Sequence, residues 1–61
     1  MNSIDLAKKI GGAYNLLPED IEHFVKKYKF KSFMDYAFWR TSNKITNDQL
    51  HEEIMTALME S

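Results

Sequence analysis

Cysteine is absent from this 61-residue sequence, which also contains only two histidines, two glycines and one proline. Without cysteine there can be no disulfide and no thiolate ligand for a metal. The histidines, His23 and His51, lie far apart in the sequence, and neither belongs to a metal-binding motif such as HExxH. We therefore expect no metal site and no cofactor, and the fold must be stabilised by packing or by association with another chain.

Long apolar runs are missing as well. No stretch approaches the roughly 20 consecutive apolar residues that a transmembrane helix requires. The segment MNSIDLAKKI at the N-terminus lacks the apolar stretch of a secretory signal peptide. We expect a soluble, cytoplasmic protein that makes no contact with membranes.

Recognisable catalytic motifs are also lacking. No glycine-rich loop follows a strand pattern, and no serine lies in the sequence context of a known nucleophile. Ligand pockets usually have a volume of about 300 Å³ or more, which a single domain of this size can hardly enclose. These absences predict a protein that is not an enzyme and has no small-molecule substrate. Its function should be to bind another macromolecule.

The net charge of −1 gives the chain no strong overall field, but the charges are unevenly distributed. Residues 23–44 contain six lysines and arginines against one acidic residue. Residues 45–61 contain four acidic residues and no lysine or arginine. A basic middle beside an acidic end is suited to self-association or to a partner of opposite charge.

Helical patterns cover most of the chain and predict an all-α fold. Pro18 followed by Glu19 and Asp20 is a typical helix start, because proline fits the first turn and acidic side chains favour the positive end of the helix dipole. Thr46 with Gln49 three residues later predicts a capping box at a second start. We expect a single domain, residues 1–61, built as a compact bundle of three or four short helices. Their approximate ranges are 3–14, 18–29, 33–41 and 46–59.

Two adjacent glycines, Gly11 and Gly12, interrupt the first of these helices. Each glycine costs about 1 kcal/mol relative to alanine in a helix interior. The pair therefore predicts either a break in the helix or a close approach of another helix at a position that cannot hold a side chain.

The segment FMDYAFWR, residues 33–40, is apolar on nearly every side. A domain this small buries only about 60% of the surface of its unfolded chain, so one core cannot cover all of these side chains. We expect this helix to be the aromatic centre of the bundle, or to be shared between the core and a partner. Trp39 illustrates the choice, because a lone tryptophan can be a core residue or a binding hot spot.

A surface formed by this helix and the last one is the leading candidate for protein binding. Tryptophan and arginine are enriched at binding hot spots, and methionine adapts to irregular surfaces. The candidate partner-binding residues are Tyr36, Phe38, Trp39, Arg40, Met55 and Met59. The same surface predicts a homodimer, through the exposed side of the helix at 33–41 and the methionines of the last helix. The expected function is that of a small regulator or inhibitor that binds a larger protein.

Nucleic-acid binding by a transcriptional regulator is the alternative function. The segment VKKYKFKSF, residues 25–33, alternates lysines with aromatic rings, as a strand that binds single-stranded nucleic acid would. The helical signals before it favour instead the end of a helix followed by a short linker, with solvated lysines. The segment DLAKKIGG resembles the start of a helix-turn-helix, but Pro18 would then fall inside the recognition helix. The candidate phosphate-binding residues are Lys26, Lys27, Lys29, Lys31, Arg40 and Lys44.

Overall fold

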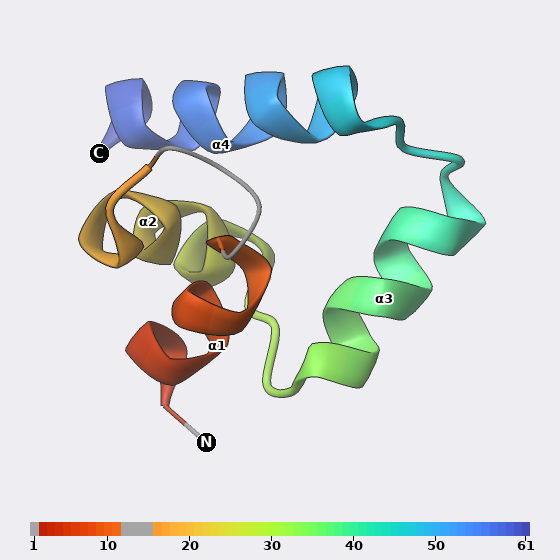
Figure 1. Cartoon of the computed structure of the whole chain (residues 1–61), viewed down its shortest axis with the longest axis horizontal. Helices are drawn as coiled ribbons and strands as arrows, with labels where there is room; N and C mark the ends of the chain where they lie inside the picture. Colours follow the sequence, from red (N-terminus) through yellow and green to blue (C-terminus); the bar gives the residue numbers. More distant parts are fainter. Residues whose placement is uncertain (1, 12–15) are drawn as a thin grey trace.

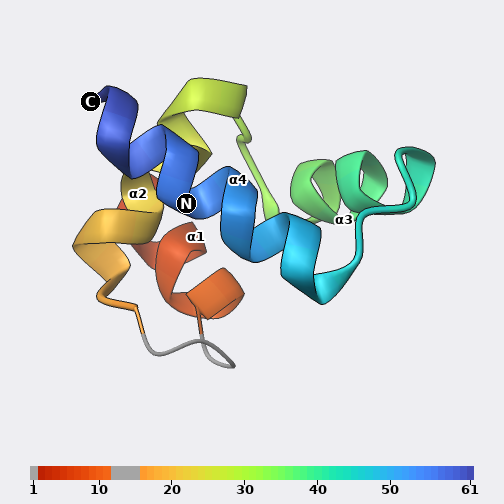
Figure 2. The same ribbon diagram turned by 90° about the horizontal axis from the view of Figure 1, so that it is seen from above.

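Four α-helices and no strand make up the part of the chain that the structure describes, residues 2–11 and 16–61. In this computed structural model the helices are α1 (Ser3–Ile10), α2 (Pro18–Tyr28), α3 (Phe33–Ser42) and α4 (Asn47–Glu60). Figure 1 shows α1, α2 and α4 packed together, with α3 standing to one side of them. Figure 2, seen from above, shows the same arrangement. The expected all-α bundle of short helices is therefore confirmed.

All four helices begin within one residue of the positions predicted from the sequence. The side chain of Asn2 accepts a hydrogen bond from the Asp5 N–H (2.9 Å) at the start of α1. Pro18 occupies the first turn of α2. At α4, the Thr46 hydroxyl accepts from the Gln49 N–H (3.1 Å), and the Gln49 side chain accepts from the Thr46 N–H (2.9 Å). These caps satisfy N–H groups that a helix leaves without an intrahelical partner at its N-terminus. Each cap joins residues only three positions apart, so the sequence alone can indicate it.

A lysine in the left-handed backbone conformation follows both α2 and α3, as the C-cap of α2 and as the residue after the C-cap of α3. Lys29 has a φ of 58° and Lys44 a φ of 52°. After each lysine the chain bonds back to its helix, from the Phe30 N–H to the Val25 carbonyl (3.3 Å) and from the Ile45 N–H to the Arg40 carbonyl (3.0 Å). Glycine is the usual residue at this position of such a motif, because a Cβ atom disfavours the left-handed conformation.

The hydrophobic core lies between α1, α2 and α4. Within α2, the buried residues Ile21, Phe24 and Val25 follow the helical spacing seen in the sequence. Of the residues of α3, Tyr36 is the one that is buried. The core as a whole consists of Leu6, Ala7, Ile10, Ile21, Phe24, Val25, Tyr36, Leu50, Ile54 and Ala57.

Gly11 lies at a close contact between the end of α1 and α2. A Cβ atom at Gly11 would come within 2.4 Å of the Cδ1 atom of Ile21, which is fully buried. The predicted close approach at a missing side chain is therefore confirmed. Helix α1 ends at Ile10, with Gly11 as its C-cap, so the expected break in the helix also falls at the glycines. Residues 12–15, which include the second glycine, lie outside the described part of the chain.

The aromatic centre of the fold is Phe24 of α2, and the expectation that α3 would form that centre is wrong. Four rings pack edge to face around Phe24, with centroid distances of 5.3 Å for Tyr28, 5.5 Å for Phe30, 6.5 Å for Tyr36 and 5.5 Å for Trp39. Two of the four come from α3, which touches this cluster from the side. An all-round apolar pattern does not locate a helix, because a central helix and a peripheral helix with a second apolar face have the same pattern.

Candidate protein-interaction surface

The two sides of α3 have different environments. Tyr36, Trp39 and Arg40 lie on the side that faces the bundle, where Tyr36 is buried and Trp39 is half-buried. Met34 and Phe38 lie on the other side and are exposed. The division follows from helical spacing, since residues three and four positions apart share a face.

Trp39 attaches α3 to the aromatic cluster. Its ring centroid lies 4.9 Å from that of Tyr28, 5.5 Å from that of Phe24 and 5.7 Å from that of Phe30. Aromatic pairs at such distances contribute about 0.5–1.5 kcal/mol each beyond the burial of their surface. Much of the Trp39 surface is therefore occupied by contacts within the chain, and the residue holds α3 in place.

Arg40 connects α3 to the start of α4. Its guanidinium donates from Nε to the Ile45 carbonyl (3.2 Å) and from Nη1 to the Tyr36 hydroxyl (3.2 Å). Its Nη2 atom donates to the Asn47 side chain. The planar guanidinium can serve these acceptors at once, which the ammonium of lysine cannot do with the same geometry. Arg40 therefore positions α3 relative to α4.

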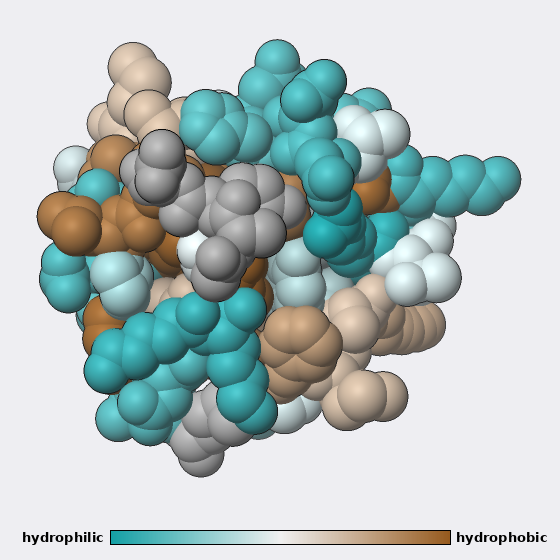
Figure 3. All heavy atoms as spheres, viewed as in Figure 1, coloured by the Kyte–Doolittle hydropathy of each residue, from teal (hydrophilic) through white to brown (hydrophobic). Residues whose placement is uncertain are grey.

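The outer face of α3, defined here as Met34, Ala37, Phe38, Thr41 and Ser42, leaves its largest apolar side chains in solvent. Met34 is 74% exposed and Phe38 is 63% exposed, and the neighbouring Phe33 is 40% exposed. In Figure 3 apolar side chains gather over the lower right of the molecule, where α3 lies. Contiguous apolar exposure on a small domain is typical of binding surfaces.

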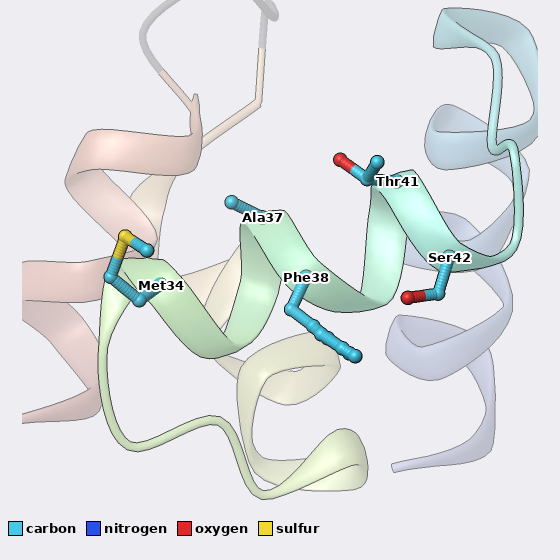
Figure 4. Close-up of a pocket in the computed structure, with 5 residues that line it drawn as sticks. All are labelled: Met34, Ala37, Phe38, Thr41 and Ser42. Atoms are coloured by element: carbon cyan, nitrogen blue, oxygen red, sulfur yellow. The ribbon is translucent and has the colours of Figure 1, made fainter.

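A shallow hollow of about 360 Å³ runs along this outer face. Its lining residues all belong to α3, as Figure 4 shows, with the ring of Phe38 projecting from the helix between Met34 and Ser42. The volume falls in the range of ligand sites. However, residues of a single helix form a convex surface, so the hollow is open to solvent and does not surround a small molecule. The shape is suited to a second surface laid over the helix.

The residues predicted to bind a partner are not gathered at one place. Phe38 alone of the four candidates on α3 points its ring outward with most of its surface exposed. On α4, Met59 is 82% exposed and Met55 is half-buried. Met34 belongs to the outer face but was not among the residues predicted to bind a partner. The sequence could have indicated it, because Met34 lies four residues before Phe38 and that spacing places both side chains on the same side of a helix.

The six basic residues proposed for phosphate binding divide into two groups. Three are engaged within the chain: Lys26 pairs with Glu22 (3.9 Å), Lys27 pairs with Glu60 (3.1 Å), and Arg40 forms the hydrogen bonds described above. The other three, Lys29, Lys31 and Lys44, are exposed, and within residues 2–11 and 16–61 they form no ion pair. The segment at 25–33 is a helix end and a linker, which confirms the helical interpretation of VKKYKFKSF.

The contact between α2 and α4 contains a strongly shifted titratable group, Tyr28. The Tyr28 hydroxyl donates to the Glu53 carboxylate. Burial, this hydrogen bond and the negative charges of Glu53 and Glu60 raise the pKa of Tyr28 from 10.0 to about 12. The Nζ atom of Lys27 lies 5.7 Å from the centre of the Tyr28 ring. The group stabilises the α2–α4 packing and lies away from the outer face of α3.

Metal chemistry finds no support in the described part of the chain. Residues 2–11 and 16–61 contain no group of three or more His, Cys, Asp or Glu side chains that could hold a metal ion. His51 is exposed and His23 is half-buried. None of the four helices is long and apolar enough to cross a membrane, as far as the described residues extend.

Comparison with known proteins finds no matching protein-family model, no matching curated protein and no matching solved structure.

Proposed function

We propose that this protein is a non-enzymatic interaction module, a regulator or inhibitor that binds a larger protein through the outer face of α3. The observation that carries the proposal is the exposure of Met34 and Phe38 on a helix that is already attached to the core by its other side. With Phe33, and taking roughly 200 Å² for each full side chain, the exposed apolar area is about 350 Å². A patch of this size on a small domain is often functional.

The area is sufficient for reversible binding. If a partner covers the patch with a similar area of its own, the gross hydrophobic gain at about 25 cal/mol per Å² is about 18 kcal/mol. Loss of translational and rotational freedom opposes binding by about 10 kcal/mol. The hydrophobic gain of the patch is therefore large enough to offset this loss, whereas the affinity itself depends on how well the partner's surface fits the patch.

The attachment of α3 supports the proposal further. Trp39 packs into the aromatic cluster and Arg40 bonds to the start of α4, so the helix is held in place before any partner arrives. Preorganisation lowers the entropy that binding would otherwise lose. Met34 and Phe38, with Ala37 and Thr41, have the i, i+3, i+4, i+7 spacing of the anchors that a helix inserts into a groove.

The proposal is tested by retention of proteins from the native cell extract on three immobilised forms of the chain. These forms are the wild type, the double variant Met34→Ala with Phe38→Ala, and the variant Met59→Ala. Met59 is a matched control, because it is an exposed methionine on a different helix. A protein retained by the wild type and by Met59→Ala but lost from the double variant supports the proposal. Retention that does not depend on Met34 and Phe38 contradicts it.

Nucleic-acid binding is a second candidate function, supported by the exposure of Lys29, Lys31 and Lys44 around α3. Three phosphate contacts would make the logarithm of the affinity for duplex DNA fall with the logarithm of salt concentration at a slope of about −3. Titration of DNA and RNA at two salt concentrations measures this slope. Tight binding with that dependence would favour this candidate over protein binding.

A further inference from the structure

Both ends of α3 carry positive charge that the described part of the chain does not neutralise. Lys31 precedes the N-cap residue Ser32, and Lys44 follows the C-cap residue Asn43. Both lysines are exposed, and within residues 2–11 and 16–61 neither forms an ion pair. Helix α3 therefore has one exposed lysine directly before its N-cap and another directly after its C-cap. The ten residues of the helix between them span about 15 Å.

The acidic residue of α3 does not cancel this charge. Asp35 lies in the first turn, where its carboxylate accepts a hydrogen bond from the backbone N–H of Lys31 (2.9 Å). The same carboxylate lies beside the positive end of the helix dipole, which it partly offsets. The ammonium groups of Lys31 and Lys44 remain available to a partner.

The backbone at Lys44 adds an independent observation. This lysine has a φ of 52°, a conformation in which glycine is favoured and a residue with a Cβ atom carries a conformational cost. A lysine therefore stands at the C-terminal end of α3 where glycine is the usual residue. Lys29, the other lysine with a positive φ, is the C-cap of α2 and does not belong to the pair Lys31 and Lys44.

Resting on the proposed function, we infer that the occupant of the outer face is an apolar groove in a different protein, with carboxylate groups at both ends of the groove. Met34 and Phe38 enter the groove as anchors. The carboxylates approach Lys31 at one end of α3 and Lys44 at the other. A groove is favoured over a flat surface because it covers a convex helix on three sides, so that Phe33 and Thr41 at the margins also lose contact with water.

Two copies that pack α3 against α3 fit this surface less well. In an antiparallel pair of α3 helices, Lys31 of one copy lies beside Lys44 of the other. In a parallel pair, each lysine meets its own equivalent. Like charges therefore approach each other in either arrangement, which opposes association.

The inference is tested with two designed helical hairpins that share the same leucine-lined groove. One hairpin carries glutamates at both groove ends, and the other carries lysines at the same positions. Binding of each to the full chain is measured by isothermal titration, and the contacted residues are mapped from the NMR shifts of the Met34 and Phe38 side chains. We expect the glutamate hairpin to bind about fivefold to tenfold more tightly than the lysine hairpin, from two exposed charge pairs.

Variants separate the charge from the apolar contact. Lys31→Gln with Lys44→Gln should remove the preference between the hairpins, whereas Lys8→Gln with Lys9→Gln removes the same number of charges from α1 and should leave it. Phe38→Ser should weaken the binding of both hairpins. Circular dichroism of this variant is the control that checks whether it is folded.

The possible results distinguish the two proposals. Equal binding of both hairpins that Phe38→Ser abolishes would overturn the acidic groove and leave the proposed function intact. Binding that Phe38→Ser leaves unchanged, or binding of neither hairpin, would overturn both. Two further measurements test other occupants. Sedimentation equilibrium tests a second copy, which would be identified by a wild-type dimer that Phe38→Ser dissociates. Titration with DNA tests nucleic acid, which would be identified by salt-sensitive binding that is lost in the Lys31 and Lys44 variant.

Discussion

Phe24 and Phe38 form a matched pair that tests the division of aromatic residues between core and surface. Phe24 is fully buried and Phe38 is 63% exposed, so the same substitution to alanine should have very different effects on the free energy of unfolding. Truncation of a fully buried phenylalanine costs about 3–5 kcal/mol. Phe24 belongs at the upper end of this range, because four aromatic rings surround it and their edge-to-face contacts are lost as well.

The magnitude can be compared with the stability of the whole domain. At about 0.05–0.15 kcal/mol per residue, a chain of 61 residues has a free energy of unfolding of about 3–9 kcal/mol. Phe24→Ala, at about 5 kcal/mol, should therefore remove more than half of this stability. Phe38→Ala should cost less than about 1 kcal/mol, because the side chain is mostly in water already and alanine has the higher helix propensity.

The assay is urea denaturation of the wild type and both variants, followed by far-ultraviolet circular dichroism and by the fluorescence of Trp39, the single tryptophan. Phe38→Leu and Phe24→Leu provide a milder pair if Phe24→Ala does not fold. Equal destabilisation by the two alanine substitutions would show that the outer face of α3 is packed against the bundle, and the reasoning about a free apolar surface would then fail.

Three further predictions concern the contacts that hold the helices in place. Arg40→Lys should lower the free energy of unfolding by about 1–2 kcal/mol, since lysine cannot reproduce the hydrogen bonds to the Ile45 carbonyl and the Tyr36 hydroxyl. Urea denaturation measures this loss, and an unchanged midpoint would contradict the prediction. Tyr28 has its pKa raised above the unfolded value, so its contribution to stability should be present below pH 10 and lost as the pH rises towards about 12. Tyr28→Phe should abolish that loss in thermal melts recorded across this range, and a variant that keeps the wild-type pH dependence would refute the assignment. Thr46→Ala should cost about 1 kcal/mol by removing the cap of α4, whereas Thr46→Ser should be close to neutral in the same melts.

The starts of the helices were predictable because they depend on neighbours in the sequence. Pro18 at the first turn of α2 and Thr46 with Gln49 at α4 act within a few residues, so no tertiary information is needed to recognise them. The close contact at Gly11 was also predictable, since a residue without a side chain in a helical segment indicates a break or the close approach of another helix. The partner of that contact, Ile21, was not, because it is brought there by the fold.

The candidate site was predictable only in part. The sequence shows that the segment at 33–40 is apolar on nearly every side, and therefore that one small core cannot cover it. It does not show which side remains exposed. Trp39 and Arg40 have the composition of a binding hot spot, yet in the structure the first packs on Phe24 and Tyr28 and the second bonds to the start of α4.

By itself, the sequence determined that this protein is an all-α bundle, where most of its helices begin, and that its apolar surface exceeds what its core can hold. These properties follow from local hydrogen bonding, helical spacing and the ratio of surface to volume in a short chain. Only the tertiary structure decided that Phe24 is the centre, that α3 lies beside the bundle, and that Met34 and Phe38 are the side chains left in water. The reason is that α3 has apolar side chains on both of its sides, so the helical pattern alone does not decide which side is buried. That choice depends on two tertiary contacts, the packing of Trp39 on Tyr28 of α2 and the hydrogen bond from Arg40 to Asn47 of α4.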